Sequence, residues 1–364
     1  PKTDILIINY DILKKYKRTL LSRKWDLAIL DEASYIKNLK AQRTVYAREI
    51  ATKAKRRLLL TGTPILNRPV ELFSLINLLD PGKWKNFFYY AKRYCGAYRR
   101  NIGGRLVWDF SGASNLRELQ EELRSTIMIR RLKKDVLPEL PKKIRQIVVL
   151  SPEELTEQVK QEKEAIQGVF SGMLDIQELD YEEVVENLNG MVNKVRFNEL
   201  AKIRHNTALA KVDKVVEHVK DILDNTNKVV VFAHHHDVVD ALMFGLREYS
   251  PVKFTGEENE REKDTAVYSF QSTLNVRVFV GSIKAAGFGL TLTAADTVVF
   301  AELDWVPGSI TQAEDRLHRI GQLNSVLVQH IVLNGSIDAT LARTLVSKQR
   351  VLDMALDTNL TSKI

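Results

Sequence analysis

An α/β protein with two lobes is the fold class that this sequence predicts. Apolar runs of strand length alternate with helical stretches near the start of the chain and again from about residue 211. Unbroken apolar runs are typical of buried parallel strands, and their alternation with helices indicates βαβ units. Residues 66–210 have mostly helical patterns. The sequence therefore predicts two parallel sheets with a helical insertion between them.

The first lobe is expected to hold three strands. They are "DILIINY" (4–10), followed by a basic helix, "WDLAILDE" (25–32), followed by a helix from Lys40 to Lys53, and "RRLLLTGTP" (56–64). The chain starts at Pro1 and enters an apolar run within a few residues. We therefore expect the first lobe to be incomplete at its N-terminal side.

The insertion and the second lobe follow. Helices are predicted at "VELFSLINLL" (70–79), at "ASNLRELQEELRSTI" (113–127) with Asn115 as N-cap, and at "SPEELTEQVKQEKEAI" (151–166) with a capping-box start. Pro138 and Pro141 interrupt the chain. Strands of the second lobe are predicted at "KVVVFAH" (228–234), "RVFVGS" (277–282), "DTVVFAEL" (296–303) and "VLVQHIVL" (326–333), and residues 336–356 as a final amphipathic helix.

Composition narrows the class of protein. The chain has 364 residues, of which 45% are hydrophobic and 27% charged, as in soluble globular proteins. No apolar run is long enough to span a bilayer, and the single cysteine, Cys95, fits a reducing intracellular setting. Residues 1–150 contain 32 Lys and Arg against 14 Asp and Glu, whereas the rest contains 22 against 32. This asymmetry favours a polyanion partner on the first half, although a well-solvated surface would also explain it.

Two strand ends in the first lobe carry candidate site residues. Asp31 and Glu32 directly follow an apolar strand, where a carboxylate can hold Mg²⁺ through water and a glutamate can orient an attacking water. The alternative is that the two acidic residues begin a helix and interact favourably with its dipole. Thr61, Gly62 and Thr63 end the next strand, either as a relay beside a phosphate site or as a plain turn.

The second lobe carries two more candidates. In "GFGLTLTAAD" (287–296), Gly287 and Gly289 let the backbone approach a partner closely, and Lys284, Thr291 and Thr293 can donate to phosphate oxygens. The alternative is an ordinary glycine turn. In "QAEDRLHRIGQ" (312–322), Arg316 and Arg319 are three residues apart and would share one helix face, and the alternative there is a solvated ion-pair surface.

Three consecutive histidines, His234 to His236, follow a predicted strand. Neighbours on an extended backbone alternate faces, so they do not converge readily on one metal ion. A loop that either faces DNA or lies at the edge of a cleft is the favoured interpretation.

DEAS (31–34), TGTP (61–64), GFGLTLTAAD and QAEDRLHRIGQ follow one another in that order. With these motifs the chain resembles the Swi/Snf family of DNA-dependent ATPases, within helicase superfamily two. The resemblance covers essentially the whole chain and includes "IINYDIL" (7–13), "TGTPILNRPVELFSLINLLDPG" (61–82), "IMIRRLKKDVLPELPKK" (127–143) and "VVVFAHHHDVVDAL" (229–242). The most specific segment, "ADTVVFAELDWVPGSITQAEDRLHRIGQ" (295–322), is similar to the annealing-helicase branch of the family.

The resemblance implies two RecA-like lobes that clamp ATP between them. The expected segments are residues 1–65, the C-terminal part of the first lobe; 66–150, the helical insertion and inter-lobe segment; 151–210, a helical protrusion; and 211–364, the second lobe with its C-terminal helix. The implied roles are Mg²⁺ binding by Asp31; activation of water by Glu32; arginine fingers at Arg316 and Arg319; nucleotide contacts at Gln312 and Gly289; and DNA binding or coupling at Asn9, Tyr10, Thr61, Thr63, Lys284, Gly287 and Thr291.

Three departures from the family pattern stand out. Ser34 and Val306 occupy positions where the family usually has histidine and asparagine, so Ser34 weakens the link to the TGTP segment. The phosphate-loop pattern G-x-x-x-x-G-K-S/T occurs nowhere in the sequence. We therefore expect an inactive or nearly inactive fragment of an enzyme.

The predicted function is an ATP- and Mg²⁺-dependent motor that translocates on double-stranded DNA or remodels it. Branched DNA or a DNA-bound protein complex is a further candidate partner, and a membrane is not. The alternatives are a non-hydrolysing DNA- or protein-binding module and a strand-separating helicase. The expected location is intracellular: the nucleus for a eukaryotic source, the cytoplasm or nucleoid for a prokaryotic or viral one.

Overall fold

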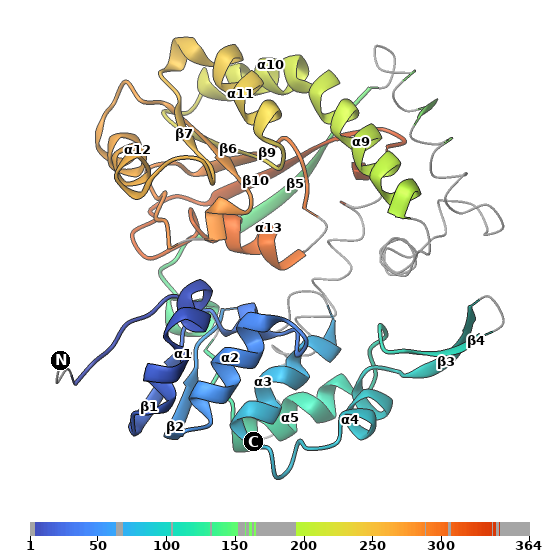
Figure 1. Ribbon diagram of the computed structural model, residues 1–364. Helices are drawn as coiled ribbons and strands as arrows, with labels where there is room; N and C mark the ends of the chain where they lie inside the picture. The colour runs from blue at the N-terminus through green and yellow to red at the C-terminus, as the bar shows by residue number, and fades with distance from the viewer. Residues whose placement is uncertain are drawn as a thin grey trace. The chain divides into compact units, whose positions relative to one another are not determined.

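A computed structural model describes residues 4–62, 68–102, 105–131, 133–151, 157, 160, 161, 164, 194–287, 289–304, 307–336, 338, 339 and 342. The chain divides into two compact units (Figure 1). Unit 1 extends to Arg130, and unit 2 begins at Arg131. The sequence predicted a single segment from residue 66 to residue 150. The structure divides this segment, because residues 131–150 belong to unit 2.

Unit 1 contains a parallel strand pair and a set of helices. Its elements are η1 (Tyr10–Ile12), α1 (Leu13–Leu21), β1 (Trp25–Leu30), η2 (Ala33–Ile36), α2 (Gln42–Ala51), β2 (Ala54–Leu59), η3 (Pro69–Glu71), α3 (Leu72–Leu79), α4 (Phe87–Tyr94), β3 (Tyr98–Ile102), β4 (Arg105–Asp109) and α5 (Leu116–Thr126). Strands β1 and β2 pair in parallel, from Trp25 opposite Ala54 to Leu30 opposite Leu59. The apolar face of α3 supplies much of the core, together with Tyr90, Tyr94 and the fully buried Cys95.

Three expectations for unit 1 were wrong. Residues 5–9 form no strand, and Ile5 and Ile7 are 79% and 91% exposed, because among the described residues no neighbouring strand pairs with them. Strands β3 and β4 form an antiparallel hairpin inside the region expected to be helical. Asn115 does precede α5, but its backbone is left-handed (φ 48°) and its side chain donates to Arg93 O instead of capping the helix.

Unit 2 is a three-layer α/β structure. Its elements are α6 (Lys133–Val136), β5 (Lys143–Leu150), α9 (Lys194–Ala210), α10 (Val212–Leu223), β6 (Val229–Ala233), α11 (His236–Gly245), η5 (Arg247–Tyr249), β7 (Val252–Phe254), α12 (Glu260–Ser272), β8 (Val278–Ser282), η6 (Ala285–Gly287), β9 (Thr297–Phe300), α13 (Pro307–Glu314) and β10 (Val326–Leu333). The six strands are all parallel, in the order β5-β10-β9-β6-β8-β7. The α/β class predicted from the sequence is confirmed.

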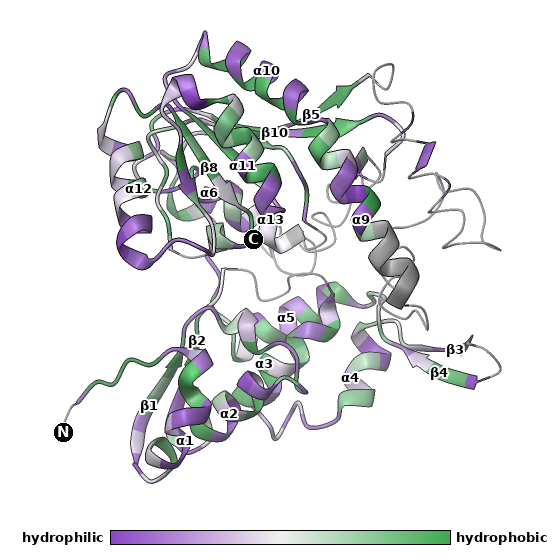
Figure 2. Ribbon diagram, turned by 45° about the horizontal axis from the view of Figure 1, so that its top comes forward, coloured by the Kyte–Doolittle hydropathy of each residue, from purple (hydrophilic) through white to green (hydrophobic). Residues whose placement is uncertain are grey.

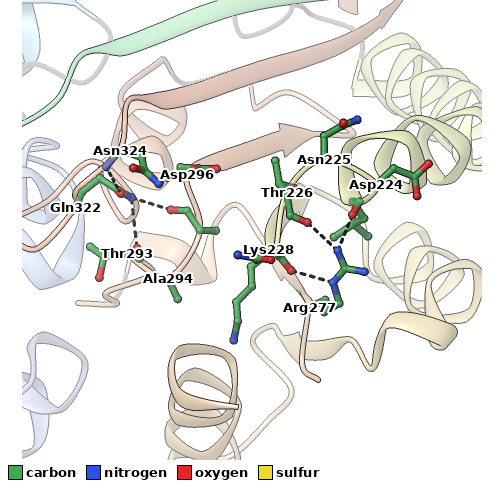
Figure 3. Close-up of a pocket in the computed structure, with 13 residues that line it drawn as sticks. Asp224, Asn225, Thr226, Lys228, Arg277, Thr293, Ala294, Asp296, Gln322 and Asn324 are labelled. Atoms are coloured by element: carbon green, nitrogen blue, oxygen red, sulfur yellow. Dashed lines mark hydrogen bonds between the residues drawn. The ribbon is translucent and has the colours of Figure 1, made fainter. Parts of the chain in front are cut away.

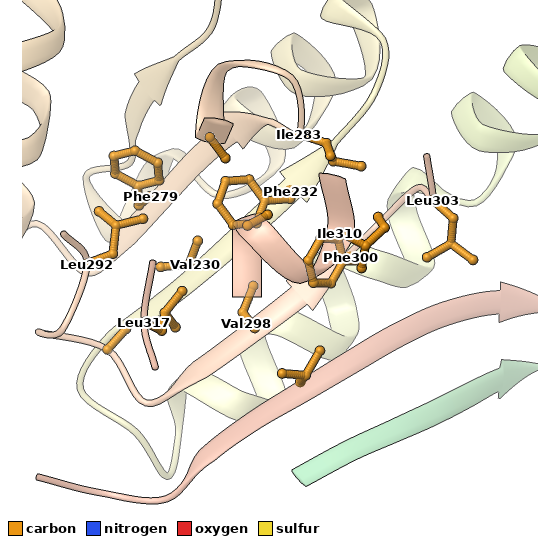
Figure 4. Close-up of a cluster of buried hydrophobic side chains, with 14 of the residues drawn as sticks. Val230, Phe232, Phe279, Ile283, Leu292, Val298, Phe300, Leu303, Ile310 and Leu317 are labelled. Carbon is orange, nitrogen blue, oxygen red and sulfur yellow. The ribbon is translucent and has the colours of Figure 1, made fainter. Parts of the chain in front are cut away.

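Alternating side chains of the central strands build a core on each face of this sheet. Val230 and Phe232 of β6 point into one cluster with residues of α12 and α13, whereas Val229 and Val231 point into another with residues of α10 and α11. Figure 4 shows the first cluster around Phe232 and Phe300. In Figure 2 the central strands are hydrophobic, while α10 alternates hydrophilic and hydrophobic residues along its length. Burial on both faces explains why these strands read as unbroken apolar runs.

Strand β5 completes one edge of the sheet by pairing with all of β10, from Lys143 opposite Val326 to Leu150 opposite Leu333. It had been expected within the inter-lobe segment, because Lys143, Arg145 and Gln146 interrupt its apolar pattern. An edge strand is exposed along part of its length, so polar residues are tolerated there. Most of the expected helix at 151–166 and most of the tail helix at 336–356 lie outside the described residues. Within the first of them, the described residues 157, 160, 161 and 164 are helical.

Unit 2 contains a buried ion triad formed by Asp338, Arg204 and Lys211. Asp338 accepts from Arg204 Nε (2.9 Å) and Lys211 Nζ (2.8 Å), and all three side chains are at most 5% exposed. Lys211 Nζ also donates to Ile331 O at 3.0 Å. The triad therefore ties α9 and the start of α10 to the end of the sheet. Among the described residues, no helix is both long and apolar enough to cross a membrane.

Candidate functional site

The carboxyl ends of β1 and β2 meet in unit 1. Leu60 N–H donates to Leu30 O (2.9 Å), and Ala33 N–H donates to Leu60 O (2.8 Å). These bonds bring the turn of Asp31 and Glu32 next to Thr61. Asp31 is exposed, Glu32 is half-buried and Ser34 is buried. Thr63 lies outside the described residues.

The turn at Asp31 and Glu32 has an uncommon backbone conformation. Glu32 has φ 44° and ψ 52°, the left-handed region that a side chain other than glycine rarely adopts. Asp31 Oδ1 accepts from Glu32 N–H at 3.0 Å, and the hydroxyl of Tyr10 donates to Asp31 O at 2.8 Å. Residues held in sparsely populated backbone regions cluster at functional sites. Glu32 shares this conformation with Asn115 and Ser250, so its place at a strand end beside Asp31 is what makes it a candidate.

Asn9 and Tyr10 support this turn from η1. The Asn9 side chain accepts from Asp11 N–H at 3.0 Å and so caps η1, which places Tyr10 against the turn. Burial and the neighbouring Asp31 carboxylate raise the pKa of the Tyr10 hydroxyl above its usual value of 10.0. Tyr10 therefore remains a neutral hydrogen-bond donor at physiological pH.

In unit 2 the loop 284–293 contacts the segment 312–322. Arg316 Nε donates to Ala286 O (2.7 Å), Arg319 Nη1 donates to Leu290 O (3.0 Å), and Leu292 N–H donates to Arg316 O (2.8 Å). A Cβ added to Gly289 would meet nothing within 4 Å, so the loop is open to a partner there. The contact gathers Lys284, Gly287, Gly289, Thr291, Arg316 and Arg319 around one loop.

The expectation that Arg316 and Arg319 share a helix face was wrong. Helix α13 ends at Glu314, and both arginines follow in turns. The chain leaves the helix because Leu317 is fully buried and the Gln322 amide donates to Ala295 O (2.8 Å), which draws the segment onto the sheet. Gln312 lies on α13 and is half-buried. Arg319 is exposed, whereas Arg316 is half-buried against the loop, so the two arginines are not equivalent.

We call residues 312–322 the arginine segment. An ion network anchors this segment to residues 133–145. Glu314, 1% exposed, accepts two bonds from Arg145 (Nε 2.9 Å and Nη2 2.6 Å), and Lys143 Nζ lies 2.8 Å from it. Asp315 binds Lys143 Nζ at 3.0 Å and Lys133 Nζ at 2.9 Å. The network therefore fixes the two acidic residues that directly precede Arg316.

Backbone contacts extend the same anchor. Lys133 Nζ donates to His318 O at 2.7 Å, and His318 Nε2 lies 2.7 Å from Pro141 O. Burial by itself would raise the pKa of Glu314, but Lys143 and Arg145 more than offset this and lower it to about 2. Glu314 is thus a carboxylate at any physiological pH. Sequence reasoning missed this network, because its partners are some 170 residues apart.

The histidine run lies in a cavity at the carboxyl edge of the sheet. The cavity measures about 600 Å³, and Lys284 and Ser282 line it together with His205 and His234 to His236. Glu302 accepts the backbone N–H groups of His234 (2.7 Å) and His235 (2.9 Å) and lies 2.7 Å from His235 Nδ1. In the part of the chain that the structure describes, no group of three or more His, Cys, Asp or Glu could hold a metal ion.

A second cavity, of about 340 Å³, lies at the opposite, amino edge of the same sheet (Figure 3). The two basic side chains that line this cavity donate to backbone carbonyls. Arg277 donates to Leu223 O, Thr226 O and Asn227 O, and Lys228 donates to Phe270 O and Thr273 O. Ligands of open α/β sheets bind at the carboxyl ends of strands. The cavity at the carboxyl edge is therefore the functional candidate.

The residues of unit 1 fit a magnesium ion. Mg²⁺ keeps several waters and takes one or two carboxylates, and Asp31 presents an exposed carboxylate at a strand end. Glu32 lies next to it and is half-buried. Carboxylates of this kind are the residue types that hold the metal ion and orient the water in a nucleoside triphosphate site.

Comparison with protein families places the chain in the helicase class. The SNF2-related domain matches residues 1–217, and the helicase conserved C-terminal domain matches residues 210–321. The chain belongs to the SNF2-related family, the Swi/Snf group of helicase superfamily two. Proteins of this family are generally DNA-dependent ATPases.

Among its relatives, "DNA annealing helicase and endonuclease ZRANB3" of Bos taurus is 39% identical over 360 residues, 97% of this chain and 32% of that protein. "SWI/SNF-related matrix-associated actin-dependent regulator of chromatin subfamily A-like protein 1" of Xenopus tropicalis is 37% identical over 355 residues, 96% of this chain and 35% of that protein. The chain thus spans about a third of these curated relatives. A solved Sulfolobus solfataricus SWI2/SNF2 ATPase core in complex with dsDNA matches 96% of this chain and 76% of its own, with 22% identity and a TM-score of 0.41.

Proposed function

We propose that this chain is part of an ATP-dependent motor that translocates along double-stranded DNA or remodels it. The observation that carries the proposal is the contact between the loop 284–293 and the arginine segment, held in place by the buried carboxylate of Glu314. A preorganised cation lowers the barrier of phosphoryl transfer because charge spreads over the phosphoryl oxygens in the transition state. The exposure of Arg319 and its bond to Leu290 O support this role.

ATP with Mg²⁺ would supply the phosphoryl group and neutralise part of its charge. On this proposal Asp31 binds the metal ion, Glu32 orients the attacking water, and Gln312 and Gly289 contact the nucleotide. Asn9, Tyr10, Thr61 and Thr63 couple this site to DNA. Lys284, Gly287 and Thr291 contact the phosphate backbone, which a basic side chain and open glycine backbone suit.

Duplex DNA is the proposed partner. The excess of basic residues in the first 150 positions supports it, since most of the affinity for duplex DNA comes from phosphate contacts. Branched DNA is a further candidate, because the relatives include proteins named annealing helicases. The proposed site of action is intracellular, and nuclear if the source is eukaryotic.

The test is ATP turnover, with and without duplex DNA, of residues 1–364 and of a version that carries an upstream phosphate-binding loop. We expect turnover only in the longer version, stimulated by DNA. In that version Arg319→Ala should lower turnover by about 10³-fold with little change in DNA affinity. The matched control is Arg261→Ala, an exposed arginine on α12, which should change neither.

Three outcomes would contradict the proposal. DNA binding without turnover in either version would favour a binding module. Unwinding of a plain duplex would favour a strand-separating helicase, whereas displacement of a triplex strand without unwinding supports a translocase. Equal losses of turnover and DNA affinity in Arg319→Ala would remove its role as a finger.

A further inference from the structure

The β3–β4 hairpin of unit 1 has a solvent-exposed surface that the proposed function leaves unused. It extends away from α4 and α5 in both views (Figures 1 and 2). Within the described part of the chain, the two strands pair only with each other, from Tyr98 opposite Asp109 to Ile102 opposite Arg105. A two-stranded ribbon buries little surface on its own. Its side chains are therefore available to a partner.

One face of this hairpin combines aromatic, apolar and basic groups. Directly opposite residues of an antiparallel pair share a face, so Arg99 lies on the same side as Trp108, and Asn101 on the same side as Leu106. The guanidinium of Arg99 and the ammonium of Lys92 each lie 5.2 Å from the Trp108 ring centroid. We call Phe88, Lys92, Arg99, Asn101, Leu106 and Trp108 the hairpin face.

A row of aromatic rings fixes the hairpin face to the core of unit 1. Phe88 contacts Trp108 at 5.9 Å and Phe110 at 5.8 Å between ring centroids. Phe110 contacts Phe87 at 5.0 Å, and Phe87 contacts the buried Phe73 at 5.2 Å. The hairpin is thus held in a defined position, which a recognition element requires.

The chemistry of the hairpin face fits unpaired nucleotides. Residues 85–109 contain six Lys and Arg and a single acidic residue, Asp109. Phe88 and Leu106 remain 50% and 65% exposed on the hairpin face, which also carries Lys92 and Arg99. Basic groups alone suffice for the phosphates of a duplex, whereas exposed rings gain contacts when bases are free to stack on them. The combination of the two is typical of single-strand binding.

We propose that the hairpin face binds an unpaired stretch of a DNA strand, through base stacking on Phe88 and phosphate contacts from Lys92 and Arg99. The proposal rests on the proposed function and names its substrate as duplex DNA that adjoins unpaired nucleotides, such as a fork. The cationic groups of Arg99 and Lys92 lie over the ring of Trp108, which orients them.

The test measures, for the full chain, the fluorescence anisotropy of a labelled blunt duplex and of a forked duplex with the same paired length, at one fixed salt concentration. We expect the fork to bind about tenfold more tightly than the blunt duplex. The double substitution Phe88→Ser/Arg99→Ser should abolish that preference and change blunt-duplex affinity by less than about threefold. The control, Phe244→Ser/Arg117→Ser, removes the same residue types from α11 and α5, where they are 70% and 79% exposed and belong to neither strand of the hairpin.

Arg99→Ser alone keeps the aromatic row intact and should give an intermediate loss of fork preference. As an independent readout, 5-iodouracil in the unpaired arm should photo-crosslink to residues 88–108. An equal affinity of the wild type for fork and blunt duplex, an unchanged preference in the double variant, an equal loss in the control, or crosslinks only elsewhere would each overturn the proposal. In those cases, DNA-stimulated ATP turnover of the version with an upstream phosphate-binding loop would still support the proposed motor function. Failure to bind any DNA would overturn both.

Discussion

Glu314 is the residue on which the geometry of the arginine segment depends most. It receives a bidentate pair of bonds from Arg145 and a third contact from Lys143, and it is almost fully buried. A carboxylate in this position stabilises Arg145 and shares Lys143 with Asp315 in a partly desolvated setting. It directly precedes the turn in which Arg316 and Arg319 lie. Its role in the proposed mechanism is therefore to position these arginines.

Replacement of this carboxylate should destabilise unit 2. We expect Glu314→Gln to lower the free energy of unfolding by about 3 kcal/mol, because a buried carboxylate loses its charge-assisted bonds to Arg145 and Lys143. Urea denaturation followed by circular dichroism measures this. Glu217→Gln is the control, since Glu217 is 67% exposed in its pair with Lys214, and it should cost less than about 0.5 kcal/mol. Similar losses in the two variants would show that Glu314 contributes no more than a surface ion pair.

At the scale of single elements, two asparagines show how a helix start depends on its surroundings. Asn259 caps α12 fully: its side chain accepts from Glu262 N–H (3.1 Å), and the Glu262 side chain accepts from Asn259 N–H (2.9 Å). Asn115, at the equivalent position before α5, makes no such bond. Its side-chain amide instead donates to Arg93 O on α4, a contact that the local sequence does not predict.

The capping bond of Asn259 should therefore contribute to stability. Asn259→Ala should lower the free energy of unfolding by about 1 kcal/mol, because it leaves the N–H of Glu262 without its acceptor. Asn259→Asp keeps the acceptor and should retain the stability of the wild type. Thermal denaturation of the three proteins gives the comparison. Equal melting temperatures for the alanine and aspartate variants would mean that the cap does not stabilise the fold.

At the scale of the whole molecule, the buried ionisable groups of unit 2 link its stability to pH. Burial lowers the pKa of His330 from 6.5 to about 4, although the nearby Glu314 opposes this. The pKa of Asp338 is lowered from 3.8 to about 2, since Lys211 and Arg204 outweigh the effect of burial. A depressed pKa in the folded state means that the unfolded state takes up protons first as the pH falls. Stability therefore declines in two steps on acidification.

The first step belongs to His330. Its contribution is complete above about pH 6.5 and is lost as the pH falls toward 4; those of Asp338 and Glu314 are lost between about pH 4.5 and 2. His330→Gln, which cannot take up this proton, should therefore lose less stability than the wild type between pH 7.5 and 5. Urea denaturation midpoints at these two pH values provide the measurement. Parallel declines in both proteins would assign the acid sensitivity to other groups.

The sequence by itself determined the elements whose cause is local or periodic. Strands β6, β8, β9 and β10 were predicted because burial on both faces demands unbroken apolar runs. Asp31, Thr61 and the loop 284–293 were found as strand-end positions, since the carboxyl ends of parallel strands are where ligands bind. The Gly103-Gly104 pair was an available hairpin signal for β3 and β4 that helical periodicity around it obscured.

Only the tertiary structure decided the features that depend on distant partners. The ion network of Glu314 and the triad of Asp338 join residues more than a hundred positions apart, and no local pattern specifies such pairs. The polar residues of β5 conceal an edge strand whose existence depends on β10 beside it. Arg316 and Arg319 leave the helix because the burial of Leu317 outweighs local helical propensity. Packing and charge compensation act across the whole fold, and they decide where local preferences are weak.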